Sequence, residues 1–485
     1  MILVWFVIVP AVGGILAWLS GYVSPRWPKW VSLASLAITL VLVIAFWVGQ
    51  ATAVDFSRQG SFLAEIDVPW IPQLGLGIGF HLGMDGLSLL LVALAALMGV
   101  AAVLSAWTEI EARTGLFYLS LNAVLTGIIG VFMALDMFLF YFFWEMMLIP
   151  MYFIIALWGH ENRVYASLKF LLYTQASGVL MLVSILALAF LHQQATGVLT
   201  FNYNLLLGTP VPDGIAPWLM LGFFAAFAVK LPAVPLHNWL PDAHTEAPTA
   251  GSVILAALLL KTGAYGLIRF VVPFFPNAAF DFSGVAMALG VIGIIYGAFM
   301  AFAQTDLKRL VAYTSVSHMG FVLLGVFAWN ELALQGAVMQ VLAHGVSTGA
   351  LFIIVGALQE RIHTRDMDRM GGLWTAAPKM GAVALVFSLG ALGLPGLGNF
   401  VAEFLVLIGT YQVNIAAAVL GAIGIVVATV YALWIMQRAF HGPNVYDWRI
   451  PDLNAREMLT LGVLIVVLVW LGLYPQPVFD AAGQA

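Results

Sequence analysis

Long apolar stretches separated by short polar segments run through the whole chain. A helix needs about 20 mostly apolar residues to cross a hydrocarbon core of about 30 Å. With polar residues, proline and glycine taken as boundaries, fourteen such stretches can be placed. They cover residues 2–21, 29–49, 85–106, 115–134, 136–157, 168–191, 217–239, 249–271, 283–303, 309–328, 332–357, 383–410, 415–438 and 457–475. The pattern predicts an all-α polytopic membrane protein.

Composition supports this fold class and indicates one continuous domain. Hydrophobic residues make up 63% of the chain and charged residues 8%, whereas about a quarter of the residues in a soluble protein are charged. The linkers are too short to separate independent cores, so we expect a single membrane domain over residues 1–485. The first stretch begins at Ile2 with no basic segment and no small-residue cleavage site, which indicates a retained span.

Within this domain, the sequence indicates an internal repeat. Residues 1–106 hold the first three spans, residues 115–271 and 283–438 hold five spans each, and residues 457–475 form the last span. The stretch from Gly130 to Asp136 is echoed by Gly297 to Phe302 and Asp306. Because five is an odd number, the second unit (spans 9–13) enters the membrane upside down relative to the first (spans 4–8). We therefore expect two inverted five-helix repeats.

Basic residues predict the orientation of the chain. Lysine and arginine accumulate in cytoplasmic loops, and fourteen of the eighteen fall on one side of the fourteen-span arrangement. These are Arg26, Lys29, Arg113, Arg163, Lys169, Lys308, Arg309, Arg361, Arg365, Arg369, Lys379, Arg438, Arg449 and Arg456. Arg58 and Arg269 fall on the other side, and Lys230 and Lys261 lie inside spans. We expect both termini to face the periplasm of a bacterial inner membrane.

Six ionisable residues are placed deep within the predicted spans. A charge near the bilayer centre costs roughly 2.5–3.5 kcal/mol on insertion scales and marks a functional site or a structural ion pair. A rise of 1.5 Å per residue puts these groups about 12–20 Å from the ends of their spans. They are Glu145, Lys230, Lys261, His318, His344 and Glu403, with His237, near the inner end of its span, as a weaker candidate.

Each of these residue types also has a purely structural explanation. A buried histidine is often a hydrogen-bonded core residue, and a buried lysine or glutamate can belong to a structural ion pair. His318 and His344 could also hold a b-type haem, which one histidine on each of two successive helices supports only weakly.

Two spans carry proline near the middle of the membrane. One contains Lys230-Leu-Pro232 followed by Pro235, and the other contains Gly393-Leu-Pro395-Gly-Leu-Gly398-Asn399. Proline removes a backbone donor and kinks a helix, and in a bilayer the freed carbonyls must find protein or water. We therefore predict that helices 7 and 12 are discontinuous, each with its break beside a deep charge, Lys230 or Glu403.

The absence of cysteine restricts the chemistry of this chain. Thiolate-held iron–sulfur clusters, c-type haem and disulfides are excluded. The net charge is −5 without a basic patch, which gives no support for nucleic-acid binding. We expect no cofactor on this chain, and lipid, protons and other membrane chains as its partners.

Four motifs resemble a known family. They are Phe143-Trp-Glu145-Met-Met-Leu-Ile-Pro150, the run from Lys230 through His237-Asn-Trp-Leu-Pro-Asp242-Ala-His244 to Pro248, Tyr313-Thr-Ser-Val-Ser-His318-Met-Gly-Phe321, and Gly371-Gly-Leu-Trp374. The chain resembles the antiporter-like subunits of NADH:quinone oxidoreductase, or respiratory complex I. The resemblance implies proton translocation driven by quinone reduction in other subunits, which would carry FMN, iron–sulfur clusters and quinone. It also implies L-like and N-like antiporter-like partners.

The resemblance also implies roles for the deep residues. Glu145 and Lys230 would form a paired switch, and Lys261 a central relay. His318 and His344 would be further relays, with Glu403 as the terminal site. Glu403 stands where L-like and N-like subunits usually carry lysine, which resembles the M-type branch, and the chain stops after span fourteen without a long lateral helix.

Three alternatives remain. One is a subunit of an Mrp-type Na⁺/H⁺ antiporter or a membrane-bound hydrogenase, which share these motifs. Another is a scaffold that spans the membrane without conducting, in which changes at Lys230 or Glu403 would harm assembly before pumping. A third, an independent solute carrier, is disfavoured because the sequence has no second polar cluster at mid-depth.

Overall fold

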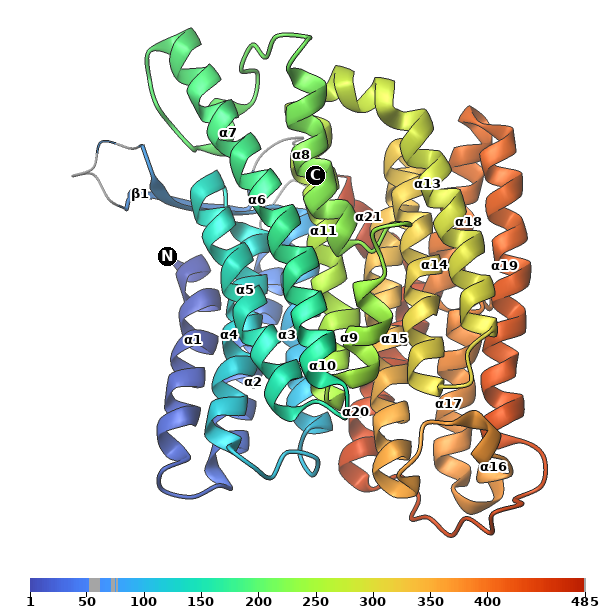
Figure 1. Ribbon diagram of the computed structural model, residues 1–485. Coiled ribbons are helices and arrows are strands. Elements are labelled where there is room, and N and C mark those ends of the chain that lie inside the picture. Colours follow the sequence, from blue (N-terminus) through green and yellow to red (C-terminus); the bar gives the residue numbers. More distant parts are fainter. Residues whose placement is uncertain (52–61, 71–74, 76, 484–485) are drawn as a thin grey trace.

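The computed structural model describes residues 1–51, 62–70, 75 and 77–483 of the chain. Arg58, which the sequence analysis places on the outer side, lies outside these described residues. Helices dominate the described chain and run roughly side by side in one bundle (Figure 1).

Twelve helices in the described part of the chain are long and apolar enough to cross a membrane. They are α1 (Ile2–Ser20), α2 (Trp27–Ala51), α3 (Gly86–Ser105), α4 (Thr114–Met133), α5 (Met137–Trp158), α6 (Arg163–Thr196), the run from α10 to α12 (Thr249–Phe274), α13 (Pro276–Phe302), α14 (Leu307–Phe327), α15 (Glu331–Ile362), α19 with its last turn (Ile415–Phe440) and α20 (Ala455–Leu473). The two other predicted spans are each assembled from two shorter helices. These are α8 (Ala216–Lys230) with α9 (Trp239–Glu246), and α17 (Pro378–Ala391) with α18 (Gly398–Val413). The fourteen-span prediction is confirmed.

The first break follows Lys230, the last residue of α8. Residues 231–238 are not helical, and the span resumes at α9. The indole Nε1 of Trp239 donates a hydrogen bond of 2.9 Å to the carbonyl of Val229, so a side chain binds a carbonyl that the break leaves free. Because the span continues through α9 to Glu246, His237 lies within the break and not near the inner end of the span, where the sequence pattern places it.

The second break covers residues 392–397, between α17 and α18. Here the ring of His318 contacts the carbonyl of Ala391, the last residue of α17, at 3.0 Å. The predicted break extended to Asn399, but α18 begins at Gly398, so Asn399 is already helical. Both predicted discontinuities are confirmed. At each break a side chain contacts a backbone carbonyl at the end of the first half, Trp239 from the second half of the same span and His318 from α14.

The eighth span has two π-helical segments that the hydrophobic pattern does not indicate. Segment η2 (Leu255–Leu259) joins α10 (Thr249–Ile254) to α11 (Leu260–Gly266), and η3 (Leu267–Val271) leads into α12 (Val272–Phe274). A π-turn shifts backbone bonding to five residues and is frequent at functional sites. Lys261 is the second residue after η2 in this span, and its Nζ donates to the carbonyl of Ala256 at 2.8 Å.

The two five-span units repeat the same order of elements. In each unit the second helix, α5 or α14, begins at an aspartate whose side chain accepts backbone hydrogen bonds, Asp136 or Asp306. In each unit the third helix is long, with 34 residues in α6 and 32 in α15. The fourth span is broken in both. These shared features agree with the predicted repeat.

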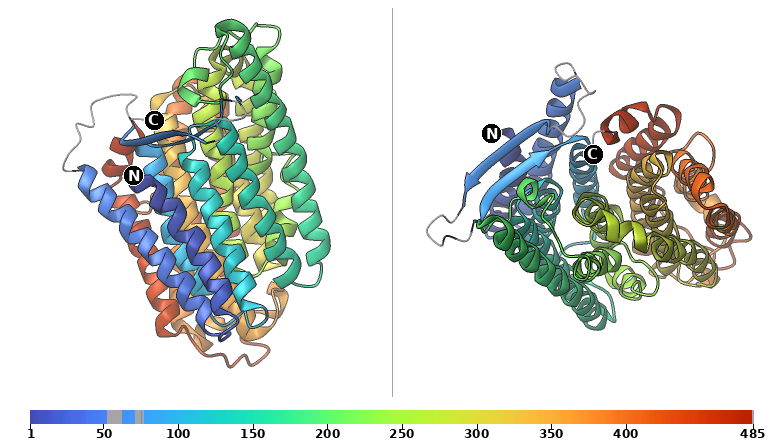
Figure 2. Two further views of the ribbon diagram at one scale, coloured as in Figure 1. Left: turned by 90° about the vertical axis from the view of Figure 1, so that its left-hand side faces the viewer. Right: turned by 90° about the horizontal axis from the view of Figure 1, so that it is seen from above.

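A small antiparallel sheet lies between spans 2 and 3. Strand β1 (Ala64–Pro69) pairs with β2 (Gly79–Met84), with Ala64 opposite Met84 and Pro69 opposite Gly79. The hairpin lies across the end of the N-terminal helices (Figure 2). Short helices also occur outside the spans: α7 (Tyr203–Leu206), η4 (Met367–Arg369), α16 (Leu373–Ala376) and α21 (Gln476–Ala482). A search for long apolar runs cannot find such short elements.

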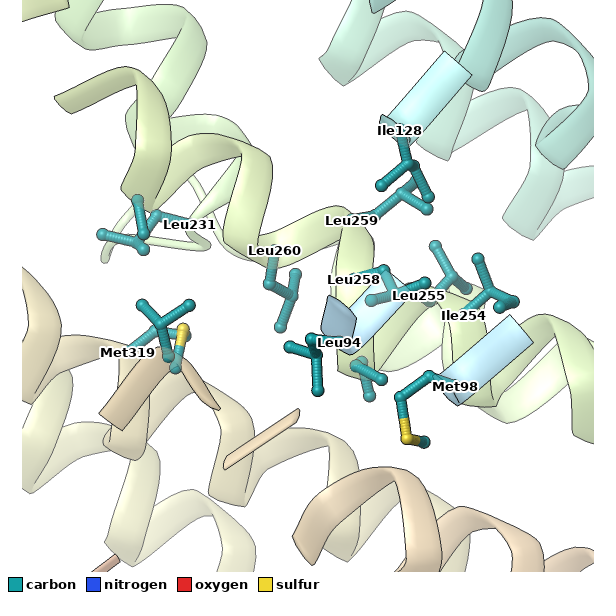
Figure 3. Packing of buried hydrophobic residues seen from close by; sticks show 14 of the residues in the cluster. Leu94, Met98, Ile128, Leu231, Ile254, Leu255, Leu258, Leu259, Leu260 and Met319 are labelled. Carbon is teal, nitrogen blue, oxygen red and sulfur yellow. The ribbon is translucent and has the colours of Figure 1, made fainter. Parts of the chain in front are cut away.

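Apolar side chains surround the centre of the eighth span. Leu94 and Met98 of α3 lie against Ile254, Leu255 and Leu258 (Figure 3). Gly345 and Gly349 of α15 allow this packing, because an added Cβ would come within 2.8 Å of Leu94 or 2.4 Å of Met98. Ionisable groups in this region are therefore surrounded mainly by apolar side chains, where a charge needs a partner.

The start of α1 and the helix α21, near the C-terminal end of the described chain, lie toward the same end of the bundle, as an even number of spans requires (Figures 1 and 2). We expect this end to be periplasmic, because the cytoplasmic side collects most of the basic residues. A C-terminal alkaline phosphatase fusion should be active and a C-terminal GFP fusion dark. Fluorescent GFP with inactive phosphatase would show that the predicted orientation is wrong.

Candidate functional site

Lys261 and His344 form the closest pair among the seven predicted site residues. Both side chains are fully buried, Lys261 on α11 and His344 on α15. Lys261 Nζ lies 2.5 Å from His344 Nδ1 and 2.8 Å from the carbonyl of Ala256. The π-segment before Lys261 thus leaves a carbonyl available to its ammonium group, while His344 offers a ring nitrogen that can accept a proton.

His318 on α14 lies directly beside His344. The two rings meet edge to face, with centroids 5.3 Å apart and an interplanar angle of 88°. Nε2 of His318 has two further neighbours, the carbonyl of Ala391 at 3.0 Å and the hydroxyl of Tyr431 at 3.1 Å. Because one neighbour can only accept and the other can donate, this nitrogen has a partner whether or not it carries a proton.

Glu403 on α18 stands at the end of this series. Its Oε1 lies 3.8 Å from His318 Nε2 and accepts a hydrogen bond of 3.1 Å from Gln340 Nε2. Gly393 in the break has φ of +77°, and an added Cβ would lie 3.0 Å from Glu403 Oε2. A glycine at this position lets the backbone turn closely around the carboxylate. The structure therefore brings together four predicted residues in the order Lys261, His344, His318 and Glu403.

Lys230 and Glu145 lie near each other but are not hydrogen-bonded. Among the described residues, no ion pair within 4.0 Å joins them, although Glu145 is close enough to act on the charge of Lys230. Lys230 is fully buried and its Nζ has no hydrogen-bond partner within the described chain. Glu145 is half-buried and accepts from Gln175 Nε2 at 3.3 Å. The two side chains are therefore neighbours that are not paired in this structure.

Gly263 brings the two lysine-bearing segments together. A Cβ at Gly263 of α11 would lie 2.6 Å from the carbonyl of Phe227 and 3.1 Å from Lys230 Cβ. The lack of a side chain therefore allows the end of α8 to pack directly against α11. Lys230 and Lys261 consequently lie on neighbouring segments that are in backbone contact.

His237 is separate from this series. Its ring packs against Tyr296 and Tyr313, with centroid distances of 5.1 and 6.3 Å. Within the described chain it has no hydrogen bond or ion pair to the other six candidates. The structure places it in the first break but does not join it to them.

Two further residues were not selected by the sequence analysis. Tyr431 of α19 is fully buried against His318. The chain has fourteen tyrosines, and the sequence around Tyr431 does not distinguish it from the others. His244 of α9 is also fully buried, and its ring stacks on Phe352 at 4.4 Å and 6°. His244 did have a signal, because it follows His237 in the same motif.

Ion pairs on the expected cytoplasmic side hold the second half of span 7 in place. Asp242 of α9 accepts from Lys169 of α6 at 2.7 Å and pairs with Arg309 of α14 at 3.2 Å. Arg365 pairs with Asp306 at 3.1 Å. The two ion pairs of Asp242 fix α9 against α6 and α14, on the side of the break that faces away from Lys230.

His160, in the connection between α5 and α6, remains neutral at physiological pH. Burial lowers its pKa to about 4, and the positive charges of Lys308 and Arg365 act in the same direction. Its Nε2 lies 3.3 Å from Gln359 Nε2. A neutral His160 can therefore hydrogen-bond to α15 and hold it against the segment between α5 and α6 without adding a charge.

The positions of the ionisable side chains also indicate which cofactors they could hold. No group of three or more His, Cys, Asp or Glu residues that could hold a metal occurs among the described residues. His318 and His344 touch edge to face. A porphyrin between two axial histidines needs the rings far apart, so this arrangement does not fit a haem.

A family model described as "NADH:quinone oxidoreductase/Mrp antiporter, TM" matches residues 134–429, more than half of the chain. NADH-quinone oxidoreductase subunit M of Escherichia coli K12 is 52% identical, over 100% of this chain and 97% of the relative. The subunit M of Pseudomonas aeruginosa is 53% identical, over 100% of this chain and 96% of that relative.

Solved structures agree with these relatives. A chain of respiratory complex I from Thermus thermophilus with bound NADH is 31% identical with a TM-score of 0.86, over 99% of this chain and 98% of that one. A chain of the Mrp complex from Dietzia is 20% identical with a TM-score of 0.84, over 99% and 96%, which shows a shared fold alone. The chain therefore belongs to the NADH-quinone oxidoreductase subunit M family, within the wider NADH:quinone oxidoreductase/Mrp antiporter family.

Proposed function

We propose that this chain is the proton-translocating, antiporter-like subunit of a bacterial NADH:quinone oxidoreductase. The observation that carries the proposal is the buried series Lys261, His344, His318 and Glu403, in which each group lies beside the next. A continuous series of titratable groups in a membrane interior is the arrangement that a proton relay needs. The redox steps, with FMN, iron–sulfur clusters and quinone, belong to other subunits.

The chemistry of the series favours stepwise transfer. An ammonium group at Lys261 donates toward His344 Nδ1, and a histidine can take a proton on one ring nitrogen and release one from the other. At His318, Nε2 donates to the carbonyl of Ala391 when protonated and accepts from Tyr431 when it is not. Glu403 then receives the proton at the end of the series. Gln340 holds its carboxylate in position.

Lys230 and Glu145 act as a switch ahead of this series. A closed pair would hold the proton on Lys230, because the carboxylate stabilises the ammonium form. An open pair leaves a buried ammonium group, from which a proton passes more readily toward Lys261. The open arrangement seen here and the close packing of α8 on α11 support this role.

The proposed route uses the two repeats asymmetrically. The unit at residues 115–271 supplies Glu145, Lys230 and Lys261, and the unit at residues 283–438 supplies His318, His344 and Glu403. Residues 1–106 and the span at 457–475 would serve as packing elements around them. His237 and His244, near the first break, are candidates for the entry side.

The surface of α5 supports the assignment of membrane partners. Half-buried Glu145 shares a face of this helix with Phe142, Ile149 and Phe153, which are 46%, 51% and 44% exposed. A carboxylate facing lipid tails is expensive, so a neighbouring protein should cover this face. L-like and N-like antiporter-like subunits in the bacterial inner membrane fit this role. The termini would face the periplasm.

Replacing Glu403 with glutamine tests the proposal. We expect the complex to assemble and to lose proton pumping about tenfold or more, because glutamine keeps the shape but cannot exchange a proton. Pumping is measured as acidification of inside-out vesicles per NADH oxidised. The matched control is Glu331→Gln, an exposed residue at the start of α15.

Two outcomes would contradict this function. If Glu403→Gln pumps normally in a fully assembled complex, Glu403 is not the terminal site. If Glu403→Gln prevents assembly while the residual complex pumps at the normal ratio, the chain acts as a scaffold.

A further inference from the structure

The ammonium group of Lys230 lies beside two aromatic rings. Its Nζ lies 5.5 Å from the ring centroid of Trp144 and 5.1 Å from that of Phe170. The side chain is fully buried, and Nζ has no hydrogen-bond partner among the described residues. A buried ammonium group without an acceptor is costly, and the face of an aromatic ring offers it negative potential at close range.

We propose that Trp144 and Phe170 form an aromatic station, which holds the Lys230 ammonium group whenever it is not paired with Glu145. This inference rests on the proposed function and makes Trp144 and Phe170 positioning residues of the switch. Lys230 would then alternate between a carboxylate and a pair of rings.

The rings are held firmly in the places that this role requires. Trp144 packs on Phe227 and Phe140, with centroid distances of 5.6 and 5.8 Å. Phe170 of α6 packs on Trp239 at 5.4 Å, and Trp239 binds the carbonyl of Val229, the residue before Lys230. The break that frees the end of α8 therefore also fixes the position of the rings around Lys230.

Helix α5 carries both alternatives for the lysine. Trp144 and Glu145 are consecutive residues, so their side chains leave the helix about 100° apart. The flexible four-carbon stem of a lysine can move between two such neighbours without moving its backbone. A small rotation or shift of α5 would consequently change the balance between the ion pair and the aromatic station.

The station has a defined consequence for proton transfer. An aromatic face attracts the ammonium form and has little attraction for the neutral amine, so it keeps Lys230 protonated when the ion pair opens. Because a ring face stabilises the ammonium less than a carboxylate does, the proton still leaves toward Lys261 more readily than from the closed pair. Weakening the negative potential of the ring faces should shorten the lifetime of the open, protonated state. It should also lower the number of protons pumped for each NADH oxidised.

Fluorinated tryptophans at position 144 test this inference in the whole complex. Each added fluorine weakens the negative potential of the indole face with little change in shape, and site-specific incorporation confines the change to one residue. We expect pumping to fall progressively from tryptophan to tetrafluorotryptophan, by about tenfold overall, which is the effect of losing a desolvated cation–π contact. Assembly should stay unchanged throughout the series.

Trp158 is the matched control, because it lies on the same helix α5, packs on Phe117 at 5.2 Å and donates to a backbone carbonyl, but has no ammonium group over its ring in the described structure. The same fluorination series at Trp158 should be flat. A flat series at both positions would overturn the proposal and leave Trp144 as a packing residue. Equal slopes at both positions would overturn it too, because the effect would then come from general repacking.

Variants at Phe170 provide an independent measurement. Phe170→Tyr retains a ring face and should keep pumping, whereas Phe170→Leu should reduce it in an assembled complex. Equal pumping by both variants would contradict the aromatic station. Failure of the station is distinguishable from failure of the proposed function, since Glu403→Gln loses pumping if the relay is correct, whatever happens at Trp144 and Phe170.

Discussion

Replacing Lys261 with methionine is expected to abolish proton pumping in an assembled complex. Methionine fills a similar volume but can neither carry a proton nor donate to His344 Nδ1, which lies 2.5 Å from Lys261 Nζ. Most of the neighbouring side chains are apolar, and the nearest titratable one, His344, already serves as the next group of the series. A loss of about tenfold or more follows, because a proton cannot cross the gap without a group that binds it.

The measurement combines NADH oxidation with pumping in the same inside-out vesicles. The control is Lys379→Met, the same substitution at an exposed lysine at the start of α17. Because methionine suits a buried apolar site, folding should not suffer, and assembly of Lys261→Met should match that of the control. Full pumping by Lys261→Met would show that protons bypass the eighth span.

The second large effect is expected at the switch. Glu145→Gln and Lys230→Ala should each strongly reduce pumping, because each removes one member of a pair that controls the proton on Lys230. The double variant should be no worse than the more severe single variant, since both changes interrupt the same step. Such non-additivity is the signature of two residues that act as a unit.

Assembly must be measured for each of the three variants. An unpaired Glu145 or Lys230 in the membrane interior is costly, and a purely structural pair would show its loss in the amount of complex formed. If both single variants pump normally in a fully assembled complex, the switch is wrong. If the amount of complex falls and the pumping ratio stays normal, the two residues form a structural ion pair.

Several candidate residues can be identified from the amino-acid sequence alone. Lys230, Lys261 and Glu403 stand out because an ionisable residue deep in an apolar span is rare and costly. Pro232 and Pro395 indicate the two broken helices, because proline removes a backbone hydrogen bond wherever it occurs in a helix. Both signals depend only on residue type and on depth within a span, which can be counted along the chain.

Other parts of the site cannot be predicted in this way. Tyr431 and Gln340 matter through what they touch, His318 and Glu403, and their partners are 113 and 63 residues away along the chain. The hairpin of β1 and β2 is too short to appear as an apolar run. The sequence pattern places His237 in the wrong part of its span, because the polar residues of α9 resemble a loop that follows the membrane.

The sequence by itself determined the fourteen spans, the two breaks and the identity of the deep charges. The cost of placing polar backbone and charged side chains in lipid acts on each segment separately and so is visible in local patterns. Only the tertiary structure decided that Lys261, His344, His318 and Glu403 form one series, and that Lys230 faces aromatic rings in place of Glu145. These neighbours depend on how helices that are distant in the sequence pack together. Gly263 and the π-segment before Lys261 determine that packing, because each changes the position of a backbone segment by a few ångströms.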